Sequence, residues 1–216
     1  MTSRYTAQGL ETEFEPGSRG RVLRNLIGIR SVREMARVES RALLGAQERL
    51  VERFSLDHRF TANDVREIHR TWLGGIYSWA GEYRSVNIAK GGFHFAAARE
   101  VPRLMSEFER NQLARHTPGR FVTEPDIARA LAVVHAELVL IHPFRDGNGR
   151  SARLLAVLMG FQAGLPPLDF SGWTGKGGKN YLAAIHAAMA QDYGPMAGLF
   201  SEVIRRSFRR FGRHGR

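Results

Sequence analysis

Hydrophobic residues recur every three or four positions along most of the chain, which is the spacing of one face of an α-helix. This spacing predicts helices over residues 35–54, 65–79, 101–108, 127–141, 150–162, 180–190 and 195–206. Thr123 is followed by Glu, Pro and Asp, a combination typical of a helix start, and Pro143 disfavours helical backbone at the residue before it. The helix over 127–141 should therefore begin near Thr123 and end near His142.

The hydrophobic period changes in one short stretch of the chain. Val86 and Ile88 lie on one side of the Gly-Gly pair at 91–92, and Phe93 and Phe95 lie on the other. Each pair has the alternating spacing of a short strand, and two glycines suit the tight turn between paired strands. The sequence thus predicts an all-α domain that contains one small β-hairpin.

Composition limits the class of protein. With 216 residues, 43% of them hydrophobic, the chain can bury the core of one domain. We expect that domain at residues 25–204, with a polar arm at 1–24 and a basic tail at 205–216. The absence of cysteine excludes disulfides and cysteine-based metal sites or nucleophiles. The first twenty residues lack the apolar region of a signal peptide, and every apolar stretch is too short to span a bilayer. We therefore expect a cytoplasmic protein without a membrane partner.

The formal net charge of +11 is distributed unevenly along the chain. The last twelve residues, RRSFRRFGRHGR, contain six arginines and no acidic residue. Such a segment can attract nucleic acid or an acidic partner, and it can equally be a solvated terminus. The charge alone does not decide between these interpretations.

The densest chemistry lies in residues 142–153, HPFRDGNGRSAR, between two apolar helices. Gly147 and Gly149 permit backbone conformations barred to other residues, and Asn148 is the next most tolerant type. Successive N–H groups in such a turn, followed by the positive end of a helix, form an anion site. Arg150 and Arg153 are three positions apart on the first helical turn, so they share a face and can bind phosphate oxygens.

Two further residues of this segment add catalytic chemistry to the predicted anion site. Asp146 would repel a bare phosphate, but it fits a Mg²⁺ ion held between one carboxylate and phosphate oxygens. His142 can accept a proton near neutral pH and suits a general base. Phe144 is expected to pack inward and fix the loop. A capped Gly-Asn-Gly turn beside a structural histidine is the simpler alternative, but so many features within twelve residues argue against it.

These twelve residues resemble the signature of the Fic family, His-Pro-Phe-x-(Asp or Glu)-Gly-Asn-Gly-Arg-x-x-Arg, at every specified position. Residues 74–95, GGIYSWAGEYRSVNIAKGGFHF, resemble the segment that leads into the flap of that family, and about 25–200 correspond to its helical core. The resemblance implies the Fic fold. It also implies an enzyme that transfers AMP from ATP to a Tyr, Thr or Ser hydroxyl of a target protein and releases pyrophosphate.

The resemblance assigns roles to individual residues of this chain. His142 would deprotonate the target hydroxyl, and Asp146 would hold Mg²⁺ at the α- and β-phosphates. The nucleotide would be bound by Phe144, Gly147, Asn148, Gly149, Arg150 and Arg153, with Gly147–Gly149 as the anion hole and the arginines on the β- and γ-phosphates. Lys90 would touch nucleotide or target, and Asn180 and Tyr181 would line the adenine pocket. The flap, Ile88–Phe95, would pair with the backbone of the target as an added strand.

Two comparisons with the family pattern refine this expectation. The Doc branch, which phosphorylates its target, has lysine where this chain has Gly149, so nucleotidyl transfer is favoured. Self-restrained members carry a (Ser or Thr)-x-x-x-Glu helix whose glutamate pairs with the second arginine of the signature. Here only Ser78–Glu82 has that spacing, and it lies in the approach to the flap. We therefore expect Arg153 to be available to ATP, and the chain to be the toxin of a toxin–antitoxin pair if a separate antitoxin supplies the glutamate.

Two other classes of function remain open from the sequence. The chain could be a catalytically silent Fic-fold binding module that uses its basic surface for nucleic acid or an acidic partner. Intact His142 and Asp146 argue against this, as does the lack of an aromatic-interleaved basic motif outside the tail. It could also be a metal hydrolase built on His135 and His142, but these histidines are seven apart without a His-Glu-x-x-His motif.

Overall fold

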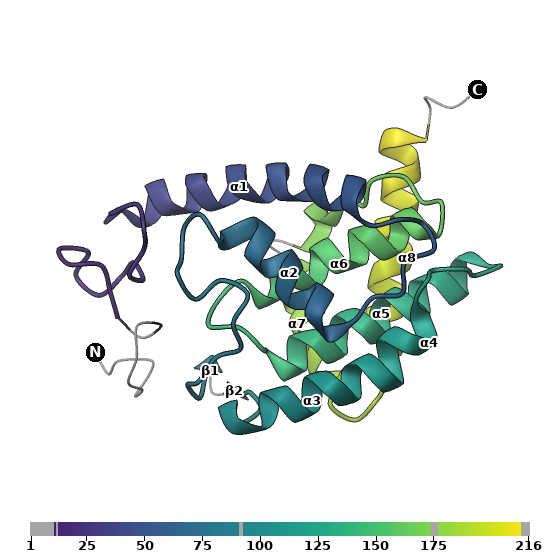
Figure 1. The fold of residues 1–216 in the computed structure, drawn as a ribbon. Coiled ribbons are helices and arrows are strands. Elements are labelled where there is room, and N and C mark those ends of the chain that lie inside the picture. The colour runs from purple at the N-terminus through teal and green to yellow at the C-terminus, as the bar shows by residue number, and fades with distance from the viewer. Residues whose placement is uncertain (1–10, 12, 91–92, 174–176, 213–216) are drawn as a thin grey trace. The chain divides into compact units, whose positions relative to one another are not determined.

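The computed structural model describes residues 11, 13–90, 93–173 and 177–212. Helices dominate the described chain (Figure 1). They are α1 (Val32–Arg53), α2 (Ala62–Leu73), α3 (Val101–Phe108), α4 (Ala114–His116), α5 (Glu124–Ile141), α6 (Asn148–Gln162), α7 (Gly177–Ala188) and α8 (Gly194–Phe211). A π-helical turn at Glu109–Leu113 links α3 to α4, and the two strands are β1 (Ala89–Lys90) and β2 (Phe93–His94). The prediction of an all-α fold with one small hairpin is confirmed.

The chain divides into two compact units. The first consists of Met1–Arg53, Ala62–Ser106 and Ile141–Ser151, and the second of Phe54–Thr61, Glu107–Leu140 and Ala152–Arg216. Most of the signature segment, from His142 to Ser151, belongs to the first unit, whereas Arg153 belongs to the second. Each unit has its own buried apolar residues and is described in turn.

The core of the first unit forms where α1 packs on α2 (Figure 1). Ala46 and Leu50 of α1 are fully buried, as are Ile68 and Trp72 of α2. These positions are four residues apart on each helix, so each helix presents one continuous apolar stripe to the other. The predicted helix over 35–54 is thus confirmed as α1.

Helix α2 ends at Leu73, which corrects the predicted extent to residue 79. The N–H of Gly74 donates to the carbonyl of Arg70 and completes the last turn, and Ile76 N–H then donates to the Leu73 carbonyl in a tighter turn. Ile76 and Trp79 are nevertheless buried. Their spacing continued the helical pattern because the loop packs inward, and a glycine pair ended the helix.

The predicted hairpin is present in the first unit. Ala89 pairs with His94 and Lys90 pairs with Phe93 in antiparallel register. The N–H of Phe95 donates to the carbonyl of Ile88 at 3.1 Å, which extends the pairing by one more bond. The Gly-Gly pair of the predicted turn lies outside the described residues.

The second unit is built around α5 and the paired helices α7 and α8. Leu131 and Leu138 of α5 are buried, and Phe200 and Val203 lie on the buried face of α8. The start of α5 has the predicted cap, because the Asp126 N–H donates to Thr123 Oγ1 at 3.3 Å. None of the helices in the described part of the chain combines the length and hydrophobicity that a bilayer-spanning segment needs.

Helix α8 extends to Phe211, whereas the apolar spacing predicted an end at 206. Ser207 explains the difference, since it is fully buried although it is polar. Its hydroxyl donates to the Val203 carbonyl at 2.8 Å and accepts the Asp169 N–H at 2.8 Å. Arg210 also pairs with Asp169 at 3.1 Å. The first half of the segment predicted as a basic tail is therefore helical, and residues 213–216 lie outside the described chain.

Candidate active site

The signature segment begins as a constrained loop between α5 and α6. Helix α5 ends at Ile141 as predicted, and α6 begins at Asn148, two residues earlier than predicted. His142 has a φ of 54° and Gly147 a φ of 81°, both in the left-handed region. For a non-glycine residue such as His142 this conformation costs on the order of 1 kcal/mol or more, so the surrounding contacts must hold it.

Gly147 is required by its surroundings as well as by its backbone conformation. A Cβ atom at this position would lie 2.8 Å from Cζ3 of Trp72 and 3.3 Å from Nε2 of His69. Helix α6 starts at the next residue, and the N–H groups of a first helical turn have no acceptor within the helix. Asn148 and Gly149 are therefore at the first-turn positions that the predicted anion site requires. The N–H of Gly147, the third group of that predicted site, donates instead to Asp146 Oδ1 at 2.6 Å.

The side chains of Asn148 and Phe144 hold this loop from inside the first unit. Asn148 Nδ2 donates to the Phe144 carbonyl, and Asn148 Oδ1 accepts the Phe144 N–H, both at 2.8 Å. The Phe144 ring is fully buried and stacks on His69 with 3.9 Å between ring centroids. Phe144 thus packs inward as predicted, and the side chain of Asn148 is used to hold the backbone of Phe144.

His69 of α2 supports this loop through a hydrogen bond to its backbone. The sequence did not indicate this role of His69. Its Nδ1 accepts the Gly81 N–H at 2.8 Å, so its Nε2 carries the proton and donates to the Asp146 carbonyl at 3.0 Å. Burial lowers the pKa of His69 to about 4, and the nearby positive charges of Arg150 and Arg70 contribute in the same direction. His69 is therefore neutral at physiological pH and fixes the Asp146–Gly147 peptide.

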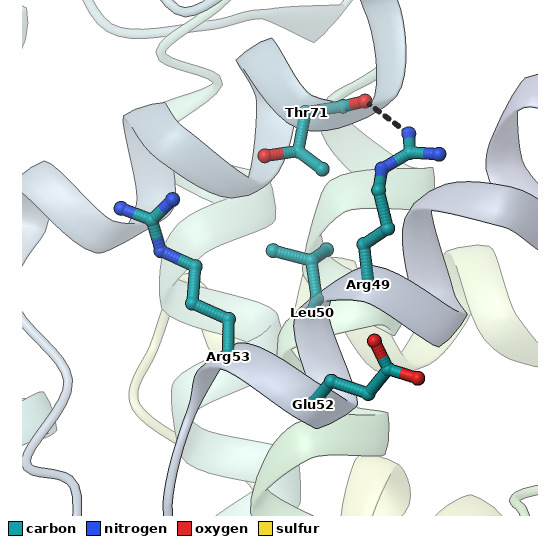
Figure 2. A pocket seen from close by; sticks show the side chains of 5 residues that line it. All are labelled: Arg49, Leu50, Glu52, Arg53 and Thr71. Atoms are coloured by element: carbon teal, nitrogen blue, oxygen red, sulfur yellow. Dashed lines mark hydrogen bonds between the residues drawn. The ribbon is translucent and has the colours of Figure 1, made fainter.

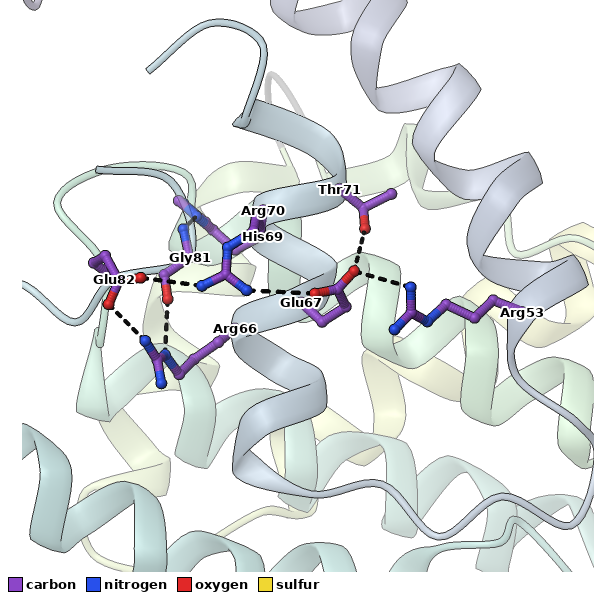
Figure 3. A network of polar contacts seen from close by, with 8 residues as sticks. All are labelled: Arg53, Arg66, Glu67, His69, Arg70, Thr71, Gly81 and Glu82. Atoms are coloured by element: carbon purple, nitrogen blue, oxygen red, sulfur yellow. Dashed lines mark hydrogen bonds and ion pairs between the residues drawn. The ribbon is translucent and has the colours of Figure 1, made fainter. Parts of the chain in front are cut away.

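A network of ion pairs attaches the Gly81–Glu82 turn to α2 (Figure 3). Glu82 accepts hydrogen bonds from Arg66 Nη2 at 2.5 Å and from Arg70 Nη2 at 3.0 Å. Arg66 Nε also donates to the Gly81 carbonyl at 2.8 Å. Glu82, whose spacing from Ser78 matched the inhibitory motif, is thus engaged by two arginines of α2.

His142 is held between a buried arginine and the hairpin. Its carbonyl accepts the Nε–H of Arg84 at 2.6 Å, and its ring stacks on Phe95 with 3.7 Å between centroids. The other N–H groups of Arg84 donate to the carbonyls of Val86 at 2.7 Å and Ala96 at 2.6 Å. Arg84 is almost fully buried, and this burial lowers its pKa. One guanidinium therefore joins the strained histidine to both ends of the hairpin segment, a role that the sequence did not reveal.

Asp146 presents an accessible carboxylate beside these groups. Its side chain is 58% exposed, and its Oδ1 accepts the Gly147 N–H at 2.6 Å. Among the described residues no cluster of three or more His, Asp or Glu side chains forms a complete metal cage. A single carboxylate still fits Mg²⁺, because this ion is usually held by one or two carboxylates together with phosphate oxygens and water.

Arg150 lies on the first turn of α6 and is held by residues of α1 and α2. Its Nη1 donates to Glu39 Oε2 at 2.6 Å, and its guanidinium lies over the Trp72 ring at 4.4 Å. Glu39 is buried, and its other oxygen accepts the Tyr77 hydroxyl at 2.7 Å. Glu39 is preceded four positions earlier by methionine, so it lacks the (Ser or Thr)-x-x-x-Glu spacing.

The remaining predicted residues lie in other surroundings. In the second unit, Tyr181 O–H lies 2.9 Å from Nε2 of buried His135. Burial and the positive charge of Arg153 lower the pKa of His135 to about 3, and burial raises that of Tyr181 to about 12. Arg153 and Tyr181 are thus electrostatically coupled, whereas Asn180 lines a separate hollow of about 500 Å³ between α7 and α8. The side chain of Lys90 lies outside the described residues.

A second hollow, of about 600 Å³, lies on the surface of the first unit between α1 and α2 (Figure 2). Its two arginines are already engaged, because Arg49 donates to the Thr71 carbonyl at 3.0 Å and Arg53 pairs with Glu67 at 3.1 Å. It contains no residue of the signature segment.

The fold is a helical domain with a constrained turn between α5 and α6, and it is similar to known proteins. Residues 59–159 match the model of the Fic/DOC family. Over 132 residues the chain is 32% identical to protein adenylyltransferase VbhT of Bartonella schoenbuchensis, covering 61% of this chain and 27% of that protein. Over 109 residues it is 38% identical to protein adenylyltransferase Fic of Culex quinquefasciatus, covering 50% and 21%.

Solved structures show the same fold. The BepC protein of Bartonella tribocorum, crystallised with bound AMPPNP, aligns with a TM-score of 0.73 at 22% identity, covering 91% of this chain and 98% of that one. A Fic domain of Bartonella quintana with bound ADP aligns with a TM-score of 0.71 at 24% identity, covering 88% and 92%. The chain therefore carries a Fic domain similar to those of protein adenylyltransferases. It spans less than a third of the length of the curated relatives it matches.

Proposed function

We propose that this protein is a protein adenylyltransferase that transfers AMP from ATP to a Tyr, Thr or Ser hydroxyl of a target protein. The observation that carries the proposal is the arrangement of the loop after α5. His142, the Asp146 carboxylate and the first turn of α6 are gathered there by His69, Arg84 and Asn148. The names of the relatives and the nucleotides bound to two structural neighbours support the same activity.

In the proposed reaction, His142 accepts the proton of the target hydroxyl. The hydroxyl oxygen then forms a bond to the α-phosphorus of ATP, and the bond from that phosphorus to the bridging oxygen breaks. The electron pair of the broken bond leaves with pyrophosphate. The N–H groups of Asn148 and Gly149 stabilise the negative charge that develops on the phosphate oxygens, because they are fixed before the reaction begins. Arg150, and Arg153 further along α6, would bind the β- and γ-phosphates.

Asp146 is the residue that would hold Mg²⁺. When bound, this ion would neutralise charge on the phosphate chain and orient it. The Asp146 backbone is fixed by His69, and its carboxylate is exposed on the same loop as His142. This chain would therefore supply one rigid ligand, and the nucleotide would supply the others.

The target is proposed to dock on the flap, Ile88–Phe95. The hairpin has only two short strands, so each strand has an outer edge whose backbone groups can pair with an extended peptide. Phe95 follows β2 and stacks on His142, so a peptide paired with the hairpin would run close to the proposed base.

We also propose that the isolated protein is active without release from an internal inhibitor, as expected for the toxin of a toxin–antitoxin pair. The support is the state of Glu82, the one glutamate with the inhibitory spacing, which pairs with Arg66 and Arg70. A separate antitoxin would then have to supply a glutamate to Arg153. Co-expression with the product of a neighbouring gene that restores cell growth would support this partner, and a harmless wild-type protein that is active in vitro would argue against it.

The central test is transfer of label from α-labelled ATP to proteins of a host lysate. Wild-type protein should label at least one band in the presence of Mg²⁺, whereas His142→Ala should lower transfer by about 10²–10⁴-fold, the usual contribution of a general base. Asp146→Ala should remove the dependence of ATP binding on Mg²⁺. His186→Ala, an exposed histidine of the second unit, is the matched control and should transfer normally. Transfer by His142→Ala at the wild-type rate would contradict the proposal.

A further inference from the structure

Glu39 is a buried acidic residue that the proposed reaction does not yet use. It lies near the start of α1, far in sequence from the signature segment, and is only 8% exposed. Its two carboxylate oxygens have separate partners, Tyr77 O–H on Oε1 at 2.7 Å and Arg150 Nη1 on Oε2 at 2.6 Å. Its backbone carbonyl accepts the indole N–H of Trp72 at 2.9 Å. Both ends of the residue are therefore fixed.

The same contacts determine where the Arg150 guanidinium points. Glu39 holds one terminal nitrogen, and the Cζ atom of the guanidinium lies over the Trp72 ring, 4.4 Å from its centroid. The other terminal nitrogen, Nη2, lies 4.0 Å from Asp146 Oδ1. One end of the guanidinium is thus fixed in the interior, and the other end lies beside the carboxylate proposed to hold the metal. A planar group that is bonded through one terminal nitrogen and lies over an aromatic ring has little rotational freedom left.

We propose that Glu39 is a positioning residue, which fixes the Arg150 guanidinium so that its Nη2 edge binds the phosphate chain of ATP. This inference rests on the proposed function. It requires that the Glu39–Arg150 pair persists when nucleotide binds. The arginine has five N–H donors in a rigid fork, so it can keep its bond to Glu39 and still bind phosphate through the other edge.

The environment of Glu39 favours an ion pair with Arg150 that persists when nucleotide binds over one that phosphate displaces. If a phosphate drew Arg150 away, the buried carboxylate would keep, among the described residues, only the Tyr77 hydroxyl as a partner. A buried charge left without its counterion is strongly unfavourable. Burial and the neighbouring Glu39 charge raise the pKa of Tyr77, so Tyr77 stays protonated and keeps donating. The carboxylate is therefore held through Oε1 by Tyr77 and through Oε2 by Arg150.

The experiment compares ATP and AMP binding by calorimetry in Glu39→Gln and Tyr77→Phe, with Glu48→Gln as control. Glu48 is exposed on the same helix, so its substitution makes the same charge change without touching Arg150. Glu39→Gln should weaken ATP binding about tenfold by loss of the charge-assisted bond, with AMP affinity changed less than about twofold because AMP lacks the outer phosphates. Tyr77→Phe should weaken ATP binding in the same direction, and Glu48→Gln should have no effect.

A double-mutant cycle with Arg150→Ala tests whether Glu39 acts through Arg150. In the Arg150→Ala background, Glu39→Gln should change ATP affinity by less than about twofold, since the group it positions is gone. Full additivity, or equal weakening of ATP and AMP together with a lower Tm, would mean a general structural role and overturn the inference. Tighter ATP binding by Glu39→Gln would also overturn it, because Glu39 would then compete with phosphate. Unchanged ATP affinity in both Glu39→Gln and Tyr77→Phe would sink the inference alone, whereas a wild type that binds no ATP would sink the proposed function as well.

Discussion

Arg84 donates its Nε–H to the carbonyl oxygen of His142 at 2.6 Å, which ties a buried cation to the backbone of the proposed general base. His142 adopts a left-handed conformation that is uncommon for a non-glycine residue. The Arg84 N–H also donates to the Pro143 carbonyl at 2.9 Å. The orientation of the imidazole therefore depends on a residue of the approach to the hairpin, far from the signature segment in the sequence.

Replacement of Arg84 should impair catalysis more than nucleotide binding. Arg84→Met removes the donors to the carbonyls of His142, Val86 and Ala96, and should lower the free energy of unfolding by about 3 kcal/mol. We expect kcat for AMP transfer to fall at least tenfold, with the Kd for ATP little changed, because the anion site is built by α6 and not by Arg84. Arg99→Met, an exposed arginine after the hairpin, is the control. Equal kcat values in the two variants would refute a positioning role for Arg84.

Substitution of Gly147 should separate the two reasons why glycine is needed there, which are the positive φ and the lack of space for a Cβ atom. Gly147→Ala places a Cβ 2.8 Å from the Trp72 ring at a positive φ, whereas Gly164→Ala has a similar φ of 72° and no atom within 4 Å. Gly164→Ala should therefore report the conformational cost alone, about 1 kcal/mol, and Gly147→Ala a further 1–3 kcal/mol, roughly the cost of overpacking. Denaturant unfolding of both variants measures the difference. Equal losses of stability would mean that Trp72 moves aside without cost.

His69 should make the protein less stable in mild acid. Its pKa is about 4 in the folded protein and 6.5 in the unfolded chain, so the unfolded state binds the proton first. The free energy of unfolding should then fall as pH decreases from about 6.5 to about 4, by about 3 kcal/mol in total, and His69 should contribute no further change below that.

Urea titrations between pH 7.5 and 4 would measure this loss in wild type and in His69→Gln. The variant should be less stable at neutral pH but should have a shallower dependence on pH. His135 in the second unit has a pKa lowered to about 3 and contributes its own acid sensitivity, so the difference between the two proteins is the relevant quantity. Parallel curves for wild type and variant would show that His69 is not the group responsible.

Mutation of Glu82 should not activate the enzyme. Its carboxylate pairs with Arg66 and Arg70 on the surface of α2, with a side-chain exposure of 56%. Glu82→Gln should therefore cost no more than about 1 kcal/mol of stability, as is usual for exposed ion pairs, and should leave the rate of auto-modification within about twofold of wild type. Gel-based auto-modification with labelled ATP would decide. A large gain in rate would identify Glu82 as an internal inhibitor and contradict the toxin proposal.

The sequence alone determined the features that depend on neighbouring residues. Helical spacing located α1, α3 and α5, the Thr123 cap and Pro143 set the two ends of α5, and the Gly-Gly pair at 91–92 marked the hairpin. The twelve-residue signature was also recognisable, because the turn and the helix after it are contiguous in the chain. Each of these features arises from interactions between residues a few positions apart. Such interactions can be predicted from the residue types of a short segment.

The distant side chains that support this segment could be identified only from the packing of the folded chain. His69, Arg84 and Glu39 contact it across 77, 58 and 111 residues, and no local pattern distinguishes them from other histidines, arginines or glutamates of the same helices and loops. The early end of α2 was also missed because it depends on tertiary packing. Ile76 and Trp79 belong to the loop after Leu73, and this loop buries them at a spacing that resembles a helix. A buried polar group must have a hydrogen-bond partner, but which residue becomes that partner depends on how the whole unit packs.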